Sequence, residues 1–350
     1  MERMEAAFVG GSRPARPSWA WFAPVLLTLA YPFLLAAFSN AIATGDGPAD
    51  AARASAGWLA LVAATSVPLV GLGWAYRLRG VSDPADLRVR ARLLAYLTMA
   101  APALFTFIGV VRGLVGRPLT DQSVWLGVWL LAIGAACLPR RGTHARIQAG
   151  EASVRLRVAH GIAASVIVLF VAFHLANHLS GLIGPATHAA IMAAGRKVYR
   201  LLPVEMLLVG LLLFQVASGA TLAARWSRRA GDGFRVLQIG SGIYVGSFVV
   251  THLNSALVSA RAVRHIDTDW AWASGGTEGL LHDAWNIRLV PHYGYGAFFI
   301  LTHLLLGLRQ VLMAHGFEPR LVNRLWAGAM IGATVAAAAI MAALLGLRLQ

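Results

Sequence analysis

Long runs of apolar residues alternate with short polar segments along the whole chain. A transmembrane α-helix needs about 20 consecutive, mainly apolar residues, and nine runs in this sequence come close to that length. The pattern therefore predicts an all-α polytopic membrane protein. The nine predicted spans cover residues 19–43, 55–76, 91–114, 122–138, 158–183, 201–224, 235–260, 289–314 and 323–348.

Composition supports the membrane assignment and excludes some chemistry. Of the 350 residues, 58% are hydrophobic and 13% are charged, whereas soluble domains carry about 25% charged residues. The first 18 residues contain no apolar core, so we do not expect the first span to be a cleaved signal peptide. The only cysteine, Cys137, excludes an intramolecular disulfide, a cysteine-ligated iron–sulfur cluster and a CxxCH haem attachment within the chain.

The formal net charge of +15 is distributed unevenly between the two sides of the predicted bundle. Twenty of the 30 Lys and Arg residues lie in the N-terminal segment, in every second connection, or at the adjoining span ends. Because Lys and Arg are in excess on the cytoplasmic side of membrane proteins, we expect a multi-pass protein of the cell (inner) membrane with a cytoplasmic N-terminus. The basic residues are then expected to contact anionic membrane lipid and not nucleic acid.

Intramembrane histidines divide the chain into two regions. The four spans of region 1–150 contain no histidine and no acidic residue, whereas the five spans of region 151–350 contain several. Polar side chains inside a membrane are costly and mark functional sites. We therefore expect the chemistry in a five-helix domain at 151–350. The role of the N-terminal four-helix region is not identified by its sequence.

Helical rise places these polar residues at two depths. At about 1.5 Å per residue, His174 and His252 lie about 24 and 26 Å from the cytoplasmic starts of their spans. His178 lies one turn beyond His174 on the same helical face. Gln215 and His303 each lie about 21 Å from the outer surface. The two levels are separated by about 15 Å in a core about 30 Å thick.

Two imidazoles at one depth, on different helices of a bundle, can bind both axial positions of a haem iron. A flat, apolar porphyrin suits such a site, so the pattern predicts haem b. Asn177 or Ser180 can orient an imidazole by a hydrogen bond. A non-haem di-iron enzyme would need several H-x-x-x-H boxes near the cytoplasmic face, and these spans contain one, toward the outer side.

Residues 155–348 resemble the five-helix di-haem cytochrome b membrane anchor of succinate:quinone oxidoreductases and quinol:fumarate reductases. The stretches that carry the resemblance are "RLRVAHGIAA", "FHLANHL", "RLLPVEMLLVGLLLFQVASGATLA", "LQIGSGIYVGSFVVTHL" and "YGYGAFFILTHLLLG". The resemblance implies haem ligands at His174, His252 and His303, and it gives Glu205 the family's acidic position. It also implies quinone as a substrate, and iron–sulfur and flavoprotein partner subunits on the cytoplasmic side.

The chain departs from this family at two places. The family has a histidine four residues before the glycine of its second helix, and this chain has Gln215 there. Glutamine is a poor axial ligand, so the resemblance implies one complete haem site, from His174 and His252, and argues against a second haem. The four extra N-terminal spans are the other departure. Because of both departures, the partner of this chain can be a dehydrogenase different from the one that the family serves.

Several assignments have an alternative at this point. His178 is the alternative to His174 as the ligand, and the one that does not bind iron is expected to bond a quinone or a backbone carbonyl. For His303 the alternative is a hydrogen bond to Gln215 on another helix. Glu205 is either a proton-handling catalytic carboxylate or a carboxylate stabilised by the dipole at a helix N-terminus.

Other polar residues lie near the ends of the spans. His160 and Arg157 are candidates to bind haem propionates or an inner quinone, although the Arg can instead extend into the membrane interface. The long connection after the seventh span suits either proton transfer at a quinone site or an aromatic membrane interface. Its titratable residues are His265, Asp267, Asp269, Glu278, His282, Asp283 and His292.

The sequence thus predicts a b-type cytochrome, a subunit of a quinone-linked oxidoreductase. It would transfer electrons between a quinone pool and a partner dehydrogenase or reductase, of the succinate/fumarate type by resemblance. The alternative is a haem-free membrane scaffold or transporter derived from a cytochrome b bundle, because a lost ligand and added spans fit that function as well.

Overall fold

The computed structural model describes residues 19–42, 48–83, 86–116, 118–138 and 151–349. Within these ranges the secondary structure is helical, without strands. The first region contains α1 (Ala23–Ile42), α2 (Pro48–Arg77), α3 (Leu87–Met99), α4 (Ala101–Val115) and α5 (Asp121–Cys137), preceded by the short η1 (Trp19–Phe22). The second region contains α6 (Glu151–Ser180), α7 (Pro185–Tyr199), α8 (Leu202–Trp226), α9 (Gly233–Leu253), η2 (Asn254–Val263), α10 (Trp270–Ala273), η3 (Asn286–Arg288), α11 (Leu289–Ala314) and α12 (Pro319–Leu344).

The protein is an all-α polytopic membrane protein, but the predicted count of nine spans is not confirmed. Among the described residues, seven helices are long and apolar enough to cross a membrane, or eight if a bent pair counts as one span. That pair is α3 and α4, which meet at 64° where a single span was predicted. Pro102 lies in the first turn of α4, and a proline there cannot continue the hydrogen bonding of the preceding helix. The predicted fourth span is α5, which has only 17 residues.

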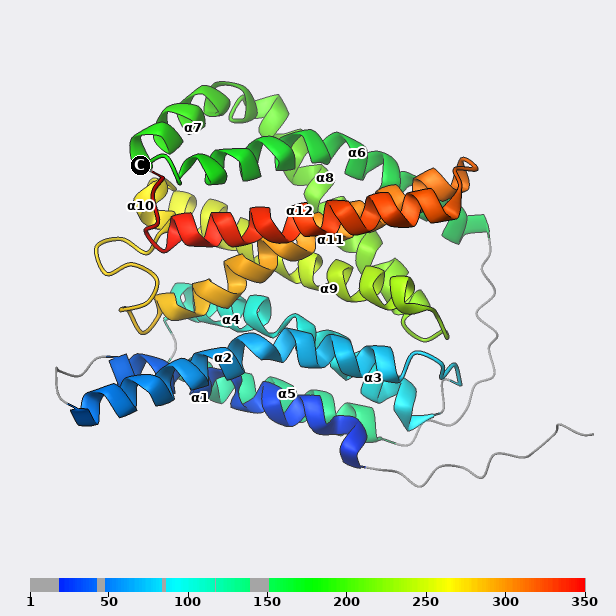
Figure 1. Ribbon diagram of the computed structural model, residues 1–350, viewed down its shortest axis with the longest axis horizontal. Helices are drawn as coiled ribbons and strands as arrows, with labels where there is room; N and C mark the ends of the chain where they lie inside the picture. Colours follow the sequence, from blue (N-terminus) through cyan, green and yellow to red (C-terminus); the bar gives the residue numbers. More distant parts are fainter. Residues whose placement is uncertain (1–18, 43–47, 84–85, 117, 139–150, 350) are drawn as a thin grey trace, which may run out of the picture.

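The connections of the helices alternate between two ends of the molecule (Figure 1). The connections between α2 and α3, α8 and α9, and α11 and α12 lie at one end, which we call the basic end. The connection between η2 and α11 and the end of α12 lie at the opposite end. The predicted charge asymmetry assumed that successive connections lie on alternate sides of the membrane, and this arrangement has the same alternation.

Five helices of the second region form a closed ring. Helix α6 contacts α8, α8 contacts α9, α9 contacts α11, α11 contacts α12, and α12 contacts α6. The first region packs against one side of this ring, chiefly through α3 and α4 against α9 (Figure 1). As a result, α9 lies between the two regions, while α6 and α8 remain largely exposed for contact with lipid.

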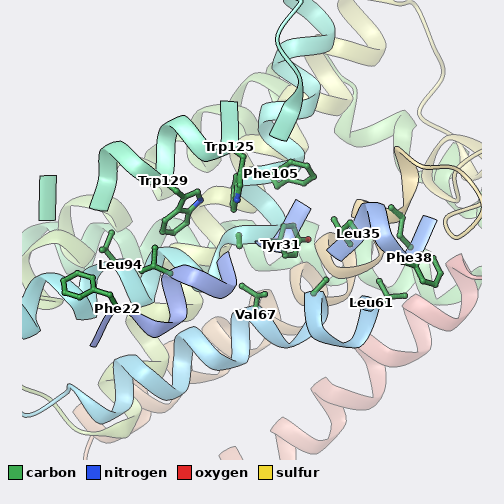
Figure 2. Packing of buried hydrophobic residues seen from close by; sticks show 14 of the residues in the cluster. Phe22, Tyr31, Leu35, Phe38, Leu61, Val67, Leu94, Phe105, Trp125 and Trp129 are labelled. Carbon is green, nitrogen blue, oxygen red and sulfur yellow. The ribbon is translucent and has the colours of Figure 1, made fainter. Parts of the chain in front are cut away.

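Aromatic side chains fill the core of the first region (Figure 2). Trp125 of α5 is almost fully buried against Tyr31, Phe105 and Trp129. Its indole nitrogen donates to the Thr28 carbonyl over 2.8 Å, so the buried polar atom is satisfied as tryptophan requires. This cluster gives the first region a rigid core of its own.

A second buried cluster joins the two regions. It brings Tyr96 and Met99 of α3 against Tyr244 of α9 and Phe299 of α11. Across the same boundary, the hydroxyl of Thr251 donates to the Ala103 carbonyl over 3.0 Å. The first region therefore braces α9, the helix that carries His252.

Close packing of α2 against α3 gives a testable prediction. A Cβ at Gly71 would lie 2.6 Å from the Ala95 carbonyl oxygen, whereas a Cβ at Gly73 would have no atom within 4 Å. We expect Gly71→Ala to lower the free energy of unfolding by about 1–3 kcal/mol, because the clash is with backbone. Gly73→Ala is the matched control and is expected to change little. Reversible unfolding in mixed micelles measures both, and equal effects would contradict this packing.

Two segments differ from their predicted structure. Residues predicted as the connection between the fifth and sixth spans form the helix α7, which begins at Pro185. Proline is favoured in the first turn of a helix. The predicted seventh span continues past α9 as the π-helix η2. π-Helical segments are rare and are frequent at functional sites, and this one begins two residues after His252.

Candidate functional site

Two imidazoles face one another across the ring of helices, toward the end of the bundle that lies opposite the basic end. The ring centroids of His174 on α6 and His252 on α9 are 5.9 Å apart, with their planes at 66°. His178 lies one turn beyond, 4.7 Å from His174, and makes ring contacts with His174 and His188 but not with His252. Between the two candidate partners of His252, the geometry therefore favours His174.

Phenylalanine rings hold both of these imidazoles. Phe170 stacks on His174 at 5.5 Å and 18°, and Phe248 stacks on His252 at 5.5 Å and 10°. Each Phe precedes its histidine by four residues, so the pair lies on one face of one helix. Phe248 also contacts the buried His292 at 4.6 Å. The stacking fixes the orientation of each imidazole without using its nitrogen atoms.

Several polar atoms around this pair lack a partner among the described residues. His174 and His252 themselves are half-buried, so neighbouring side chains do not enclose them fully. A buried polar group without a hydrogen bond costs about 1–3 kcal/mol. Several such atoms close together therefore indicate a site that a ligand completes. The unpartnered atoms are Nδ1 of His178, His188 and His292, Oδ1 of Asn177 and Nδ2 of Asn254.

His188 on α7 belongs to this cluster and was not predicted from the sequence. Its ring lies 5.4 Å from that of His178 and 4.7 Å from that of Trp270. Burial, and secondarily the charge of Arg196, lower the pKa of His188 below its usual value, which favours the neutral imidazole. Its Nε2 lies 3.2 Å from Nδ2 of Asn177. The predicted orienting role of Asn177 is therefore directed at His188 and not at His174.

A second pair of imidazoles lies toward the basic end. The rings of His160 on α6 and His303 on α11 have centroids 6.5 Å apart, with their planes at 89°. Gln215 does not bond His303, contrary to the alternative considered for it, and its amide donates to the His160 backbone carbonyl over 2.7 Å. The imidazole of His303 instead has Ser241 and Gln238 of α9 as neighbours.

Glu205 and Arg157 lie near the starts of their helices, α8 and α6. Glu205 is in the first turn of α8 and forms an ion pair with Arg261 of η2. This position matches the interpretation of Glu205 as a carboxylate stabilised by the dipole at a helix N-terminus. Its role in proton transfer stays a prediction. Arg157 is exposed near the start of α6.

The long connection before α11 is ordered by its own acidic side chains. Asp269 accepts a hydrogen bond from the Trp272 backbone amide over 2.9 Å. Asp283 accepts from two successive amides, at 2.9 and 2.7 Å. Asp267 lies 3.8 Å from Arg196 of α7. These carboxylates therefore have structural roles that the sequence pattern alone did not distinguish from proton transfer.

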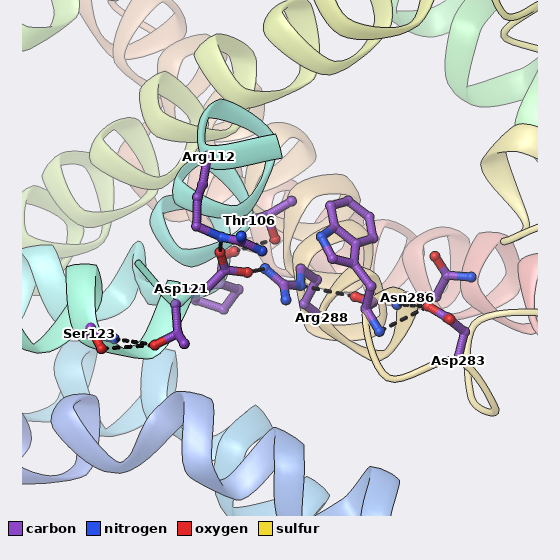
Figure 3. Close-up of polar contacts among 10 residues, drawn as sticks. Thr106, Arg112, Asp121, Ser123, Asp283, Asn286 and Arg288 are labelled. Atoms are coloured by element: carbon purple, nitrogen blue, oxygen red, sulfur yellow. Dashed lines mark hydrogen bonds and ion pairs between the residues drawn. The ribbon is translucent and has the colours of Figure 1, made fainter. Parts of the chain in front are cut away.

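A buried ion-pair cluster joins the two regions at the opposite end (Figure 3). Asp121, the first residue of α5, bonds Arg112 of α4 and, at 2.7 Å, Arg288 of the second region. A surface pocket of about 310 Å³ opens beside it and includes Trp285 in its lining. Because both oxygens of Asp121 are already bonded to guanidinium groups, we interpret this cluster as a structural joint.

The side chains available to bind a metal limit which metal or cofactor the site can hold. Among the described residues there is no group of three or more His, Cys, Asp or Glu arranged to hold a metal ion. Two imidazoles alone complete the coordination of an iron whose other four ligands belong to a porphyrin. A metal–imidazole bond is about 2.0 Å and the ring centroid lies about 1 Å further, so imidazoles on opposite sides of one ion have centroids about 6 Å apart. The pair at 5.9 Å fits this requirement.

Comparison with known proteins does not assign the chain to a family. No family model matches it, and neither does any curated protein or solved structure. The functional interpretation therefore rests on the residues of this chain and on their geometry.

Proposed function

We propose that this protein is a membrane-embedded b-type cytochrome in which His174 and His252 are the axial ligands of a haem b. The observation that carries the proposal is the centroid distance of 5.9 Å between these two imidazoles. They come from helices α6 and α9, which lie on different sides of the ring. In this interpretation His174, and not His178, is the ligand on α6.

The surroundings of the pair also support a haem. Open space lies next to Gly246 on α9, where a Cβ would have no atom within 4 Å. Gly246 is half-buried and lies six residues before His252. A flat macrocycle needs such close approach to a helix backbone, and small residues permit it.

Bis-imidazole haem iron supplies one-electron transfer without bond making. The residues of the chain hold the imidazoles in place and keep water away, chiefly through Phe170 and Phe248. A quinol that donates its electrons here releases two electrons and two protons as it becomes a quinone. His178, beside His174, and His188, beside His178, can accept or pass on such protons, and Glu205 is a further candidate at the same end.

We further propose the cellular context that charge and resemblance suggest. The basic end faces the cytoplasm of a cell (inner) membrane, since Lys and Arg are enriched on that side. A dehydrogenase or reductase of the succinate/fumarate type, with iron–sulfur and flavoprotein subunits, would then exchange electrons with the bundle at the basic end. Quinone would react at the opposite end.

Haem content tests the proposal directly. In purified protein, a pyridine haemochrome assay is expected to detect haem b, and His252→Ala is expected to remove about one haem per chain. His315→Ala, at the exposed end of α11, is the matched control and is expected to keep the wild-type content. A soluble quinol is expected to reduce the haem of the wild type.

Absence of haem after expression with ample haem supply would contradict the proposal. That result would favour the haem-free scaffold or transporter, the second function considered. Haem content that stays at the wild-type level when His252→Ala and His174→Ala are combined would show that this pair is not the axial pair.

A further inference from the structure

Arginines outnumber carboxylates at the joint between the two regions. The pocket of about 310 Å³ beside this joint is lined by two guanidinium groups, of Arg112 and Arg288, against one carboxylate, of Asp121, which leaves a net charge of +1. Arg264 adds positive charge nearby, since a Cβ at Gly113 of α4 would lie 3.3 Å from its Nη2. The joint thus carries more positive charge than its ion pairs neutralise.

Neighbouring groups hold Arg288 in one orientation. Its guanidinium carbon lies 4.6 Å from the ring centroid of Phe105 and 4.8 Å from that of Trp285. Its Nε donates to the Trp285 carbonyl over 2.9 Å, and its Nη1 donates to Asp121 over 2.7 Å. No hydrogen bond among the described residues uses its Nη2. Because a guanidinium has five N–H donors in a fixed plane, Arg288 is preorganised to bind a further acceptor.

Other donors in the lining are open as well. Arg112 bonds Asp121 through Nε, and its two terminal nitrogens bond none of the described residues. At the start of α5, Thr120 accepts from the Ser123 amide over 3.1 Å. The amides of Asp121 and Gln122 precede the first bonds within the helix. Guanidinium groups and the amides of a helix N-terminus are typical donors to phosphate.

Apolar side chains surround the mouth of this pocket. Leu119 belongs to its lining and is exposed, as is Val115 at the end of α4. Trp285 is also exposed, and tryptophan is enriched where a membrane meets water. The connection between α4 and α5 lies at an end of the bundle, the level at which lipid headgroups are expected. A ligand here would meet basic nitrogens inside the pocket and apolar side chains at its edge.

We propose that this pocket binds the phosphate of an anionic phospholipid headgroup, held by Arg112 and Arg288. The negative charge of the lipid offsets the excess positive charge of the lining. Ligand pockets span about 300–1,000 Å³, so a pocket of about 310 Å³ holds a headgroup and leaves the acyl chains outside, along Leu119. The site does not depend on the proposed haem. Most of its lining comes from the first region, which the family resemblance does not cover.

A headgroup in this position would touch both regions of the chain. Arg112 belongs to α4 of the first region, and Arg288 to η3 of the second. Both would keep their bonds to Asp121 while their remaining N–H groups donate to the phosphate. A ligand that binds only the folded protein stabilises it, so the lipid would strengthen the joint.

Native mass spectrometry of the delipidated full chain tests the inference, with phosphatidylglycerol as the probe. Gln122→Glu adds a carboxylate to the lining and keeps the ion pairs of the joint, and a carboxylate in the first turn suits a helix. We expect this variant to need about tenfold more lipid than the wild type to bind one additional phosphatidylglycerol, because like charges would then meet in the pocket.

Ser123→Glu is the matched control. It adds the same charge one residue later, outside the lining, where a glutamate can complete a capping box with Thr120. It is expected to bind phosphatidylglycerol as the wild type does. Lipid at the basic end is the same in all three proteins, so their difference reports on this pocket.

The outcomes also distinguish the sources of a phosphate group. Equal binding of phosphatidylglycerol by the three proteins would overturn the site. Binding of phosphatidylcholine as tight as that of phosphatidylglycerol would overturn the preference for an anionic headgroup. If inorganic phosphate binds the wild type but not Gln122→Glu, and phosphatidylglycerol binds neither, the ligand is free phosphate and the lipid is the wrong source. Haem content is expected to be equal in all three proteins, so failure of the haem proposal would not affect this result.

Discussion

Asp121→Asn is expected to lower the free energy of unfolding by about 3 kcal/mol, although the two side chains have the same shape. Asp121 is 4% exposed and compensates Arg288, which is 8% exposed. Breaking a buried ion pair by removing one partner costs about 3–5 kcal/mol, because an uncompensated charge stays buried. Asparagine retains one acceptor oxygen, so we expect the lower end of that range.

Asp86→Asn is the matched control for this measurement. Asp86 pairs with Arg88, and the two side chains are 20% and 37% exposed. This pair is much more exposed than Asp121 and Arg288, and a surface pair contributes about 0.2–1 kcal/mol, while asparagine is as good an N-cap as aspartate. Reversible unfolding in SDS micelles is expected to separate the two variants.

The double variant Asp121→Asn, Arg288→Met adds a second readout. It is expected to recover part of the lost stability, because it removes the charge that the single variant leaves unpaired. If Asp121→Asn costs no more than Asp86→Asn, the joint between the two regions does not depend on this pair.

Gly242→Leu is expected to lower the free energy of unfolding by about 1–3 kcal/mol, because a leucine side chain overpacks a filled position. A side chain at this position must occupy the space of the His303 ring, since even a Cβ would lie 3.3 Å from Nδ1 and closer to Cε1. Displacement of the ring would separate His303 from both Ser241 and His160. The loss of these contacts is therefore expected to destabilise the bundle, while the haem proposed at the His174–His252 pair is retained.

Gly73→Leu is the matched control, because Gly73 is exposed on α2 with no atom near its missing side chain. It is expected to keep the wild-type stability. Equal stability of Gly242→Leu and Gly73→Leu would mean that Gly242 does not pack against the His303 ring as described. A complete loss of haem would point to a wider disruption of α9, which circular dichroism would detect.

Hydrophobic periodicity predicted the fold class, because an apolar run of about 20 residues has few alternatives to a spanning helix. It missed the bend between α3 and α4, because apolar residues continue through Pro102. The break is caused by the proline, which lacks a backbone N–H, and not by a change in hydrophobicity. It also missed α7, whose mixed composition resembles a connection. The helix is evident from Pro185 at its start and from the buried His188 and Met192, four residues apart.

Depth arithmetic paired His174 with His252 correctly in space but not His160 with His303. The fifth span was predicted to start at residue 158, which put His160 at the membrane surface. Helix α6 begins at Glu151, about 10 Å earlier, so His160 lies more than two turns inside the helix. The direction in which Gln215 points depends on helix rotation, and a sequence pattern defines rotation poorly when a helix such as α8 is apolar on all sides.

The separation of the two histidine pairs along the bundle has an electrical consequence. The levels are about 15–21 Å apart by helical rise, which is half to two-thirds of a membrane core of about 30 Å. An electron passing from the haem proposed at the His174–His252 pair to a partner at the basic end would cross that share of the transmembrane voltage on its way. Since a full crossing is worth about 2.3 kcal/mol per 100 mV, the transfer would be biased by about 1.2–1.6 kcal/mol per 100 mV. With the basic end inside a cell whose cytoplasm is negative, inward transfer would be opposed and outward transfer assisted, so the voltage would help set the direction of the reaction.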